Sequence, residues 1–196
     1  MIKSIKLYNR FNMDCFASTE GLNFPYNHWY LVSIYGNPEK PLMVENTGSV
    51  FKKLGLQKYV SLNFWDLDDR EFNKIKPQYP NATIFNREHA NKIIRLLHMA
   101  QKDKKDSALV VHCAAGISRS AAVGTFACDY CKLDYAEFVK ENPSIYSNQY
   151  VLNILRRQAN LLPFSGIMSD GIDWASIDEH FGIERFKRLV LKKKKD

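Results

Sequence analysis

Four runs rich in β-branched and aromatic residues mark the chain up to residue 113. Polar residues or Gly and Pro bound each run, a pattern that predicts β-strands. The expected strands are "SIKLYNRF" at 4–11, "HWYLVSIYG" at 28–36, "KYVSLNFW" at 58–65 and "ALVVHC" at 108–113. The last run is apolar without alternation, which is typical of a strand that is buried on both faces at the centre of a sheet.

Segments with helical periodicity separate and follow these strands. "NREHANKIIRLLHMAQKDKK" carries an apolar stripe and closes in lysines, so it predicts an amphipathic helix. Asp134 and Glu137 stand at the spacing of a capping box, and a later helix is expected to start at Ser147 and end before Pro163. Helices are expected at 86–105, 120–133, 134–142 and 147–162. Strands followed by helices that cover them predict an α/β layer architecture.

The end of the chain differs from this body. A linker, "PFSGIMSDG", precedes a helix expected at 176–195, where an apolar face follows a capping-box pattern. We therefore expect a catalytic domain at 1–165 and a linker with an appended basic helix at 166–196. Closing lysines contribute much of the net charge of +7. Such a block is usually a solvated end, although it can contact acidic surfaces, and no nucleic-acid partner is expected.

Length and composition indicate a soluble globular protein. A chain of 196 residues can bury a sizeable core, and no apolar run approaches the roughly 18 residues that cross a bilayer. The N-terminus has no continuous apolar region typical of a secretory signal, so a cytoplasmic location is expected, with reduced cysteines. Cys128 and Cys131 are more typical of core thiols than of a zinc or redox pair, because no second ligand pair accompanies them.

The segment "VVHCAAGISRSAAVG" at 110–124 carries the candidate chemistry. A strand ending at Cys113 and a helix beginning near Arg119 leave a loop of small residues at a helix N-terminus. Backbone N–H groups and the helix dipole form an anion site there, and Gly116 can adopt the positive φ that a tight loop requires. The same field favours a cysteine thiolate, and an arginine fork can grip two phosphate oxygens. The segment predicts a nucleophile facing a bound phosphorus.

These residues resemble a known family. "HCAAGISRS" is similar to the signature loop of the cysteine-dependent protein tyrosine phosphatases, most of all in the dual-specificity-like branch. "YVSLNFWDLDD" resembles the strand and acid loop that precede it, and "NPSIYSNQYVLNIL" resembles the helix that follows. The resemblance covers about residues 28 to 160. It implies a central mixed sheet flanked by helices, a phosphorylated protein as substrate, and neither metal nor cofactor.

The resemblance also implies roles for the loop residues. Cys113 would attack phosphorus, and Arg119 would hold the phosphate oxygens together with the loop amides. Ser120 would hydrogen-bond the Cys113 sulfur as it leaves, and His112 would orient the loop from beneath. The loop amides belong to Ala114, Ala115, Gly116, Ile117, Ser118 and Arg119.

A general acid is needed as well, because an alkoxide or phenoxide leaves poorly without a proton. Asp66, Asp68 and Asp69 crowd the loop after a predicted strand. Asp66 lies where the family places its acid and is preferred, Asp68 is the alternative, and any of the three can instead cap a turn. An apparent insertion at 70–86 makes the spacing to the cysteine longer than the family usually shows. Asn148 either helps to position the acid loop or caps a helix.

Three functions remain open at this stage. The first is a phosphatase of phosphotyrosine or phosphoserine/threonine in proteins. The second uses the same chemistry on RNA 5′-triphosphates or phosphoinositides, although the loop "AAGIS" has no lysine to meet extra ring phosphates. The third is a non-catalytic phosphopeptide-binding module, which would be expected to lose Cys113 or Arg119. Both residues are present.

Overall fold

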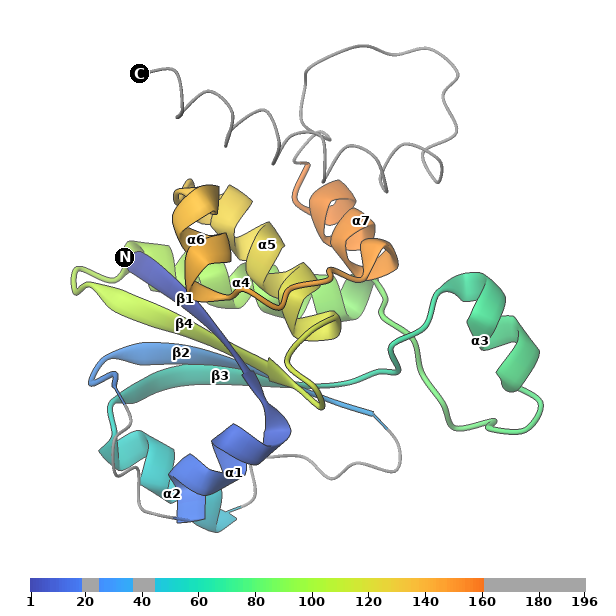
Figure 1. The fold of residues 1–196 in the computed structure, drawn as a ribbon, viewed down its shortest axis with the longest axis horizontal. Coiled ribbons are helices and arrows are strands. Elements are labelled where there is room, and N and C mark those ends of the chain that lie inside the picture. Colours follow the sequence, from blue (N-terminus) through green and yellow to red (C-terminus); the bar gives the residue numbers. More distant parts are fainter. Residues whose placement is uncertain (19–24, 37–44, 161–196) are drawn as a thin grey trace. The chain divides into compact units, whose positions relative to one another are not determined.

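A computed structural model describes residues 1–18, 25–36 and 45–160 of the chain (Figure 1). The linker and helix expected at 163–195 lie outside the described residues. The expected domain boundary at residue 165 lies there too and stays a prediction.

The described strands form one four-stranded sheet in the order β1-β4-β2-β3. The expected α/β class and central sheet flanked by helices are confirmed. All three neighbouring pairs are parallel, however, whereas the sequence predicted a mixed sheet. The physical reason is that at least one helix lies between successive strands. Such a crossover brings the chain back to the end of the sheet where the previous strand began, so the next strand runs in the same direction. The strands are β1 (Ile2–Asn9), β2 (Trp29–Tyr35), β3 (Leu56–Asn63) and β4 (Ser107–Cys113).

Seven helices are described. Four of them, α4 to α7, lie where the sequence predicts helices, although α7 begins at Gln149 rather than Ser147 because Asn148 is its N-cap. Three others were not predicted. The helices are α1 (Arg10–Ser18), α2 (Glu45–Lys53), α3 (Asp69–Ile75), α4 (Arg87–Lys102), α5 (Arg119–Cys131), α6 (Tyr135–Glu141) and α7 (Gln149–Gln158).

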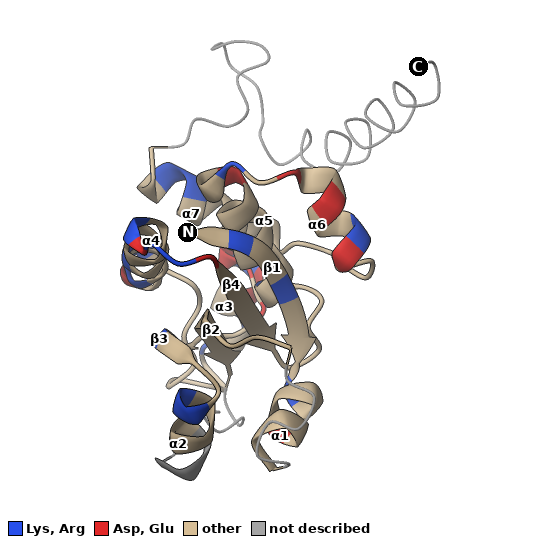
Figure 2. Ribbon diagram, turned by 90° about the vertical axis from the view of Figure 1, so that its left-hand side faces the viewer, with Lys and Arg blue, Asp and Glu red and all other residues tan. Residues whose placement is uncertain are grey.

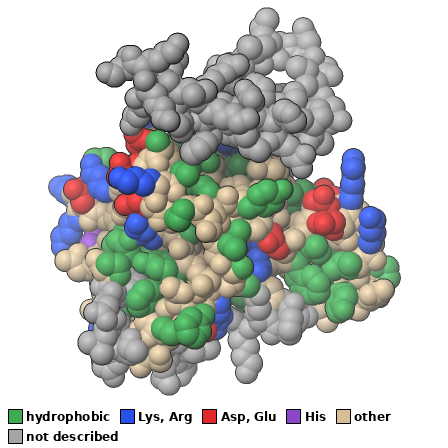
Figure 3. Space-filling model, in the orientation of Figure 1, with side chains coloured by type: hydrophobic (Ala, Val, Ile, Leu, Met, Phe, Trp, Pro, Cys, Tyr) green, Lys and Arg blue, Asp and Glu red, His purple; other side chains and the backbone are tan. Residues whose placement is uncertain are grey.

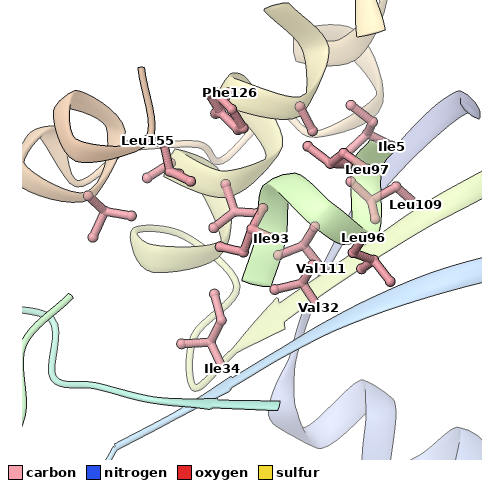
Figure 4. Packing of buried hydrophobic residues seen from close by; sticks show 14 of the residues in the cluster. Ile5, Val32, Ile34, Ile93, Leu96, Leu97, Leu109, Val111, Phe126 and Leu155 are labelled. Carbon is pink, nitrogen blue, oxygen red and sulfur yellow. The ribbon is translucent and has the colours of Figure 1, made fainter. Parts of the chain in front are cut away.

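Helices cover both faces of the sheet, with α1 and α2 on one side and α4 to α7 on the other (Figure 2). The larger core lies beneath α4, α5 and α7, where Val32, Ile34 and Val111 of the sheet meet Ile93 and Phe126 (Figure 4). A smaller cluster fills the opposite face and includes Met13, Trp29, Leu31, Phe51 and Val110. Covering both faces explains why the central strands β2 and β4 are buried at nearly every position.

Strand β4 is buried at each of its seven positions, as its unbroken apolar run predicts. Its neighbours are β1 and β2, so its carboxyl end opens at the middle of the sheet edge. Open parallel sheets bind their ligands at this edge. No helix in the described parts of the chain is long and apolar enough to span a membrane.

Candidate active site

The loop from 114 to 118 joins the end of β4 to the start of α5. Its turn is made at Gly116, which has a φ of 76°. Three backbone hydrogen bonds fix the loop from outside. The amide of Arg10 donates to the Ala114 carbonyl over 3.0 Å, that of Tyr146 to Ile117 over 3.0 Å, and that of Asn148 to Ser118 over 3.3 Å. The loop is therefore tied to α1 and to the segment that leads into α7.

The Cys113 side chain lies inside this loop and is 2% exposed. Its sulfur is 3.2 Å from the Ser120 hydroxyl oxygen and accepts a hydrogen bond of 3.3 Å from the Gly116 amide. The Gly116 amide and the Ser120 hydroxyl thus both contact the sulfur that the sequence predicts to be the nucleophile.

Arg119 is the first residue of α5 and is 6% exposed. Its Nη1 donates to the Phe64 carbonyl oxygen over 3.0 Å, directly after β3 and two residues before Asp66. Gly36 leaves room for the guanidinium, since a Cβ there would lie 3.2 Å from Nη1. The Phe64 carbonyl thus orients the planar arginine fork beside the loop.

His112 lies beneath the loop and is fully buried. Its Nε2 is 2.8 Å from the Ser33 hydroxyl oxygen on β2. Burial, together with the positive charge of Arg10, lowers the pKa of His112 to about 3. The imidazole is neutral near pH 7, so it serves to connect two strands under the loop rather than to donate a proton.

Asp66 is exposed beside the loop. Its Oδ1 accepts two hydrogen bonds, from the Ser118 hydroxyl over 2.9 Å and from the Asn148 side-chain amide over 2.8 Å. Both bonds end on the same carboxylate oxygen, and Oδ2 has no hydrogen-bond partner among the described residues. Ser118, expected only to offer an amide, thus also connects the loop to the carboxylate.

The other two aspartates have different partners. Asp68 is the N-cap of α3 and forms a complete capping box with Glu71, with bonds of 2.8 and 3.1 Å. Asp69 accepts a hydrogen bond of 2.9 Å from the Tyr150 hydroxyl. Burial, and the bond to Asp69, raise the pKa of Tyr150 to about 12, so its hydroxyl stays protonated as the donor.

Asn148 has both roles that the sequence left open. Its Oδ1 accepts from the Val151 amide over 3.0 Å and caps α7, while its Nδ2 donates to Asp66. One side chain therefore links the start of α7 to the acid loop.

The two cysteines of α5, Cys128 and Cys131, have thiols that stay protonated near pH 7. Burial raises the pKa of Cys128 to about 12 and that of Cys131 to about 11. No disulfide joins any of the four cysteines, and no group of residues that could hold a metal ion exists in the described ranges.

The loop geometry predicts the effect of Gly116→Ala. A Cβ at this position would lie 2.8 Å from the Asn9 amide nitrogen and from the Tyr8 carbonyl carbon, and the positive φ is strained for alanine. Backbone atoms cannot move aside, so we expect the loop to shift and kcat/KM for a small aryl phosphate to fall by about 100-fold.

Gly55→Ala is the matched control, because Gly55 also has a positive φ, 87°, and lacks space for a Cβ, but lies at the start of β3. Chemical denaturation should show that both variants are destabilised, whereas only Gly116→Ala should lose activity per folded molecule. Equal specific activities would show that the tight turn at Gly116 is not needed for the chemistry.

Comparison with known proteins places this loop in context. The family described as protein-tyrosine phosphatase matches residues 78–159, which include β4, the loop, α5 and α7. No curated protein matches the chain.

Several solved structures are similar at low identity. The human tyrosine phosphatase-like serine/threonine/tyrosine-interacting protein is 15% identical, with 81% of this chain and 92% of that chain covered and a TM-score of 0.39. Tk-PTP in the active form is 15% identical, with 80% and 90% covered and a TM-score of 0.44. PTPMT1 in complex with PI(5)P is 14% identical, with 80% and 90% covered and a TM-score of 0.45.

Proposed function

We propose that this chain is a dual-specificity-like member of the cysteine-dependent protein tyrosine phosphatase superfamily and hydrolyses phosphomonoesters in proteins, a proposal that the family match over residues 78–159 supports. The proposal rests on the groups around the Cys113 sulfur. Cys113 lies in a loop closed by Arg119, with the Ser120 hydroxyl 3.2 Å from its sulfur and a carboxylate tethered to the same loop through Ser118. This set supplies a nucleophile, an anion site and a proton donor.

In the first step, the Cys113 thiolate attacks phosphorus. An S–P bond forms, the ester P–O bond breaks, and Asp66 gives its proton to the leaving oxygen. The loop amides and the Arg119 guanidinium bind the non-bridging oxygens, whose charge they stabilise in the transition state. The attachment of Asp66 through Oδ1 leaves Oδ2 to carry the proton.

In the second step, water attacks the phosphocysteine. Asp66 takes a proton from the water, an O–P bond forms, and the S–P bond breaks. The sulfur leaves as a thiolate that the Ser120 hydroxyl and the Gly116 amide stabilise. Inorganic phosphate is released, and the residues named here perform both steps.

The loop side chains favour a substrate with a single phosphate group. Residues 114 to 118 are Ala, Ala, Gly, Ile and Ser, none of which is charged. Arg119 is the only cation that the loop contributes. A phosphorylated side chain of a protein meets this requirement without additional cations.

The role of Asp66 predicts a dependence on the leaving group. Asp66→Ala should lower kcat for an alkyl phosphate such as a phosphoserine peptide by about 10²- to 10⁴-fold, because its leaving oxygen needs a proton. An activated aryl phosphate should lose less than about tenfold. Steady-state turnover of both substrates measures the difference.

Asp68→Ala is the matched control, because Asp68 lies two residues away and caps α3. Loss of the cap should lower the free energy of unfolding by about 1 kcal/mol without changing the ratio of the two rates. A leaving-group effect in Asp68→Ala, and none in Asp66→Ala, would mean that Asp68 is the acid.

A further inference from the structure

A cavity of about 390 Å³ opens beside the acid loop, between α3 and α7. Most of its lining residues are apolar or aromatic, and a few are polar or charged. Figure 3 shows hydrophobic side chains gathered over the α3 segment of the molecule. The walls include Phe72, Ile84, Phe85, Tyr150 and Ile154, and Arg87 also lines the cavity.

The apparent insertion at 70–86 builds much of this cavity. Phe72 comes from α3, while Ile84 and Phe85 come from the segment between α3 and α4. That return is fixed near the acid loop, since the Trp65 amide donates to the Thr83 carbonyl over 2.8 Å and the Thr83 hydroxyl to the Asn63 carbonyl over 2.8 Å. The extra residues therefore form a pocket wall rather than a detached loop.

Two short connections join the cavity to the site around Cys113. Tyr150 lines the cavity and donates to Asp69, three residues after Asp66. Tyr150 also lies two residues after Asn148, which donates to Asp66. An extended peptide advances about 3.3–3.6 Å per residue, so a side chain bound in this pocket would stand at a fixed offset from a phosphoresidue bound at Cys113.

We propose that the cavity binds one bulky apolar side chain of a phosphopeptide substrate, at a fixed offset from the phosphorylated residue. The inference rests on the proposed function and assigns a specificity site to it. The volume lies at the lower end of the range for ligand pockets, which suits one side chain rather than a helix or an acyl chain. Asn86 caps α4 through Oδ1, and Arg87 donates through Nε to the Gln158 side-chain oxygen. The Asn86 Nδ2 group and the terminal nitrogens of Arg87 are left as donors to a peptide backbone beside an apolar anchor.

Binding to the Cys113→Ser protein tests the proposal. Fluorescent phosphotyrosine peptides carry one leucine at successive offsets in a Gly/Ser background, and anisotropy gives each Kd. One offset should bind about tenfold more tightly than the peptide without leucine, because an apolar side chain is buried. Ile84→Ser should abolish that gain. Ile94→Ser, the same change at a half-buried position of α4 outside the cavity, should keep it.

Turnover of a small aryl phosphate by otherwise wild-type protein distinguishes failure of the specificity site from failure of the proposed function. Turnover that Ile84→Ser leaves unchanged, combined with a leucine preference that this variant loses, supports the cavity as a specificity site. Turnover without any preferred offset, or with a preference that survives Ile84→Ser, overturns the inference while the proposed function stands. Absence of turnover overturns the proposed function, and the inference with it.

Discussion

Cys113→Ser should abolish turnover of an aryl phosphate, with a loss of roughly 10⁴-fold or more in kcat, because removing a nucleophile costs most of the catalytic power of such a site. The fold should survive. The two side chains have nearly the same shape, and a serine oxygen can keep the partners of the sulfur, the Ser120 hydroxyl and the Gly116 amide. Steady-state kinetics and a denaturation curve measure the two effects.

Cys128→Ser makes the same exchange at a buried thiol of α5 that lies outside the loop at 114–118 and donates to the Leu133 carbonyl oxygen over 3.5 Å. It should change stability modestly and leave kcat intact. Full activity of Cys113→Ser, or equal losses in the two variants, would refute the nucleophile assignment.

Arg119→Lys should lower kcat/KM by roughly 10³-fold, even though the charge is kept. A lysine ammonium is a point charge and cannot reproduce the planar fork that holds two phosphate oxygens. It would also lose the geometry of the bond from Nη1 to the Phe64 carbonyl. An arginine that stabilises a phosphoryl transition state is worth about 10³- to 10⁵-fold.

Arg156→Lys provides the comparison. Arg156 is also a helical arginine with a fixed partner, Asp129 at 2.9 Å, but it lies on α7. Its replacement should cost less than about 1 kcal/mol of stability and leave kcat/KM unchanged. If Arg119→Lys retained wild-type kcat/KM, the bidentate role of Arg119 would be wrong.

Local patterns made β4, the loop and α5 predictable from sequence. A buried parallel strand has an unbroken apolar run, Gly116 marks a turn, and the small residues after Arg119 indicate a buried helix. The unpredicted helices are short. At nine residues or fewer, α1, α2 and α3 are too short for an apolar repeat to stand out in the sequence, and Phe11 of α1 continues the strand-like run of β1.

The sequence could only partly show which of the three aspartates is the general acid. The spacing of Asp68 and Glu71 fits a capping box, so the sequence contained a signal that Asp68 caps α3. The bond between Ser118 and Asp66 joins residues 52 positions apart and depends on how the loops fold together. The cavity likewise depends on how 70–86 packs against α7, which no local pattern encodes.

The phosphocysteine itself is the central claim, and rapid acid quench during turnover of an aryl phosphate tests it most directly. The Ser120→Ala protein is suited to this, because loss of the hydroxyl 3.2 Å from the sulfur should slow the second step and let the intermediate accumulate. Mass spectrometry of the peptide that contains Cys113 should then show one added phosphoryl group, formed in the presence of chelator. Continued turnover with no phosphoryl group on Cys113, or with the group on another residue, would contradict the mechanism.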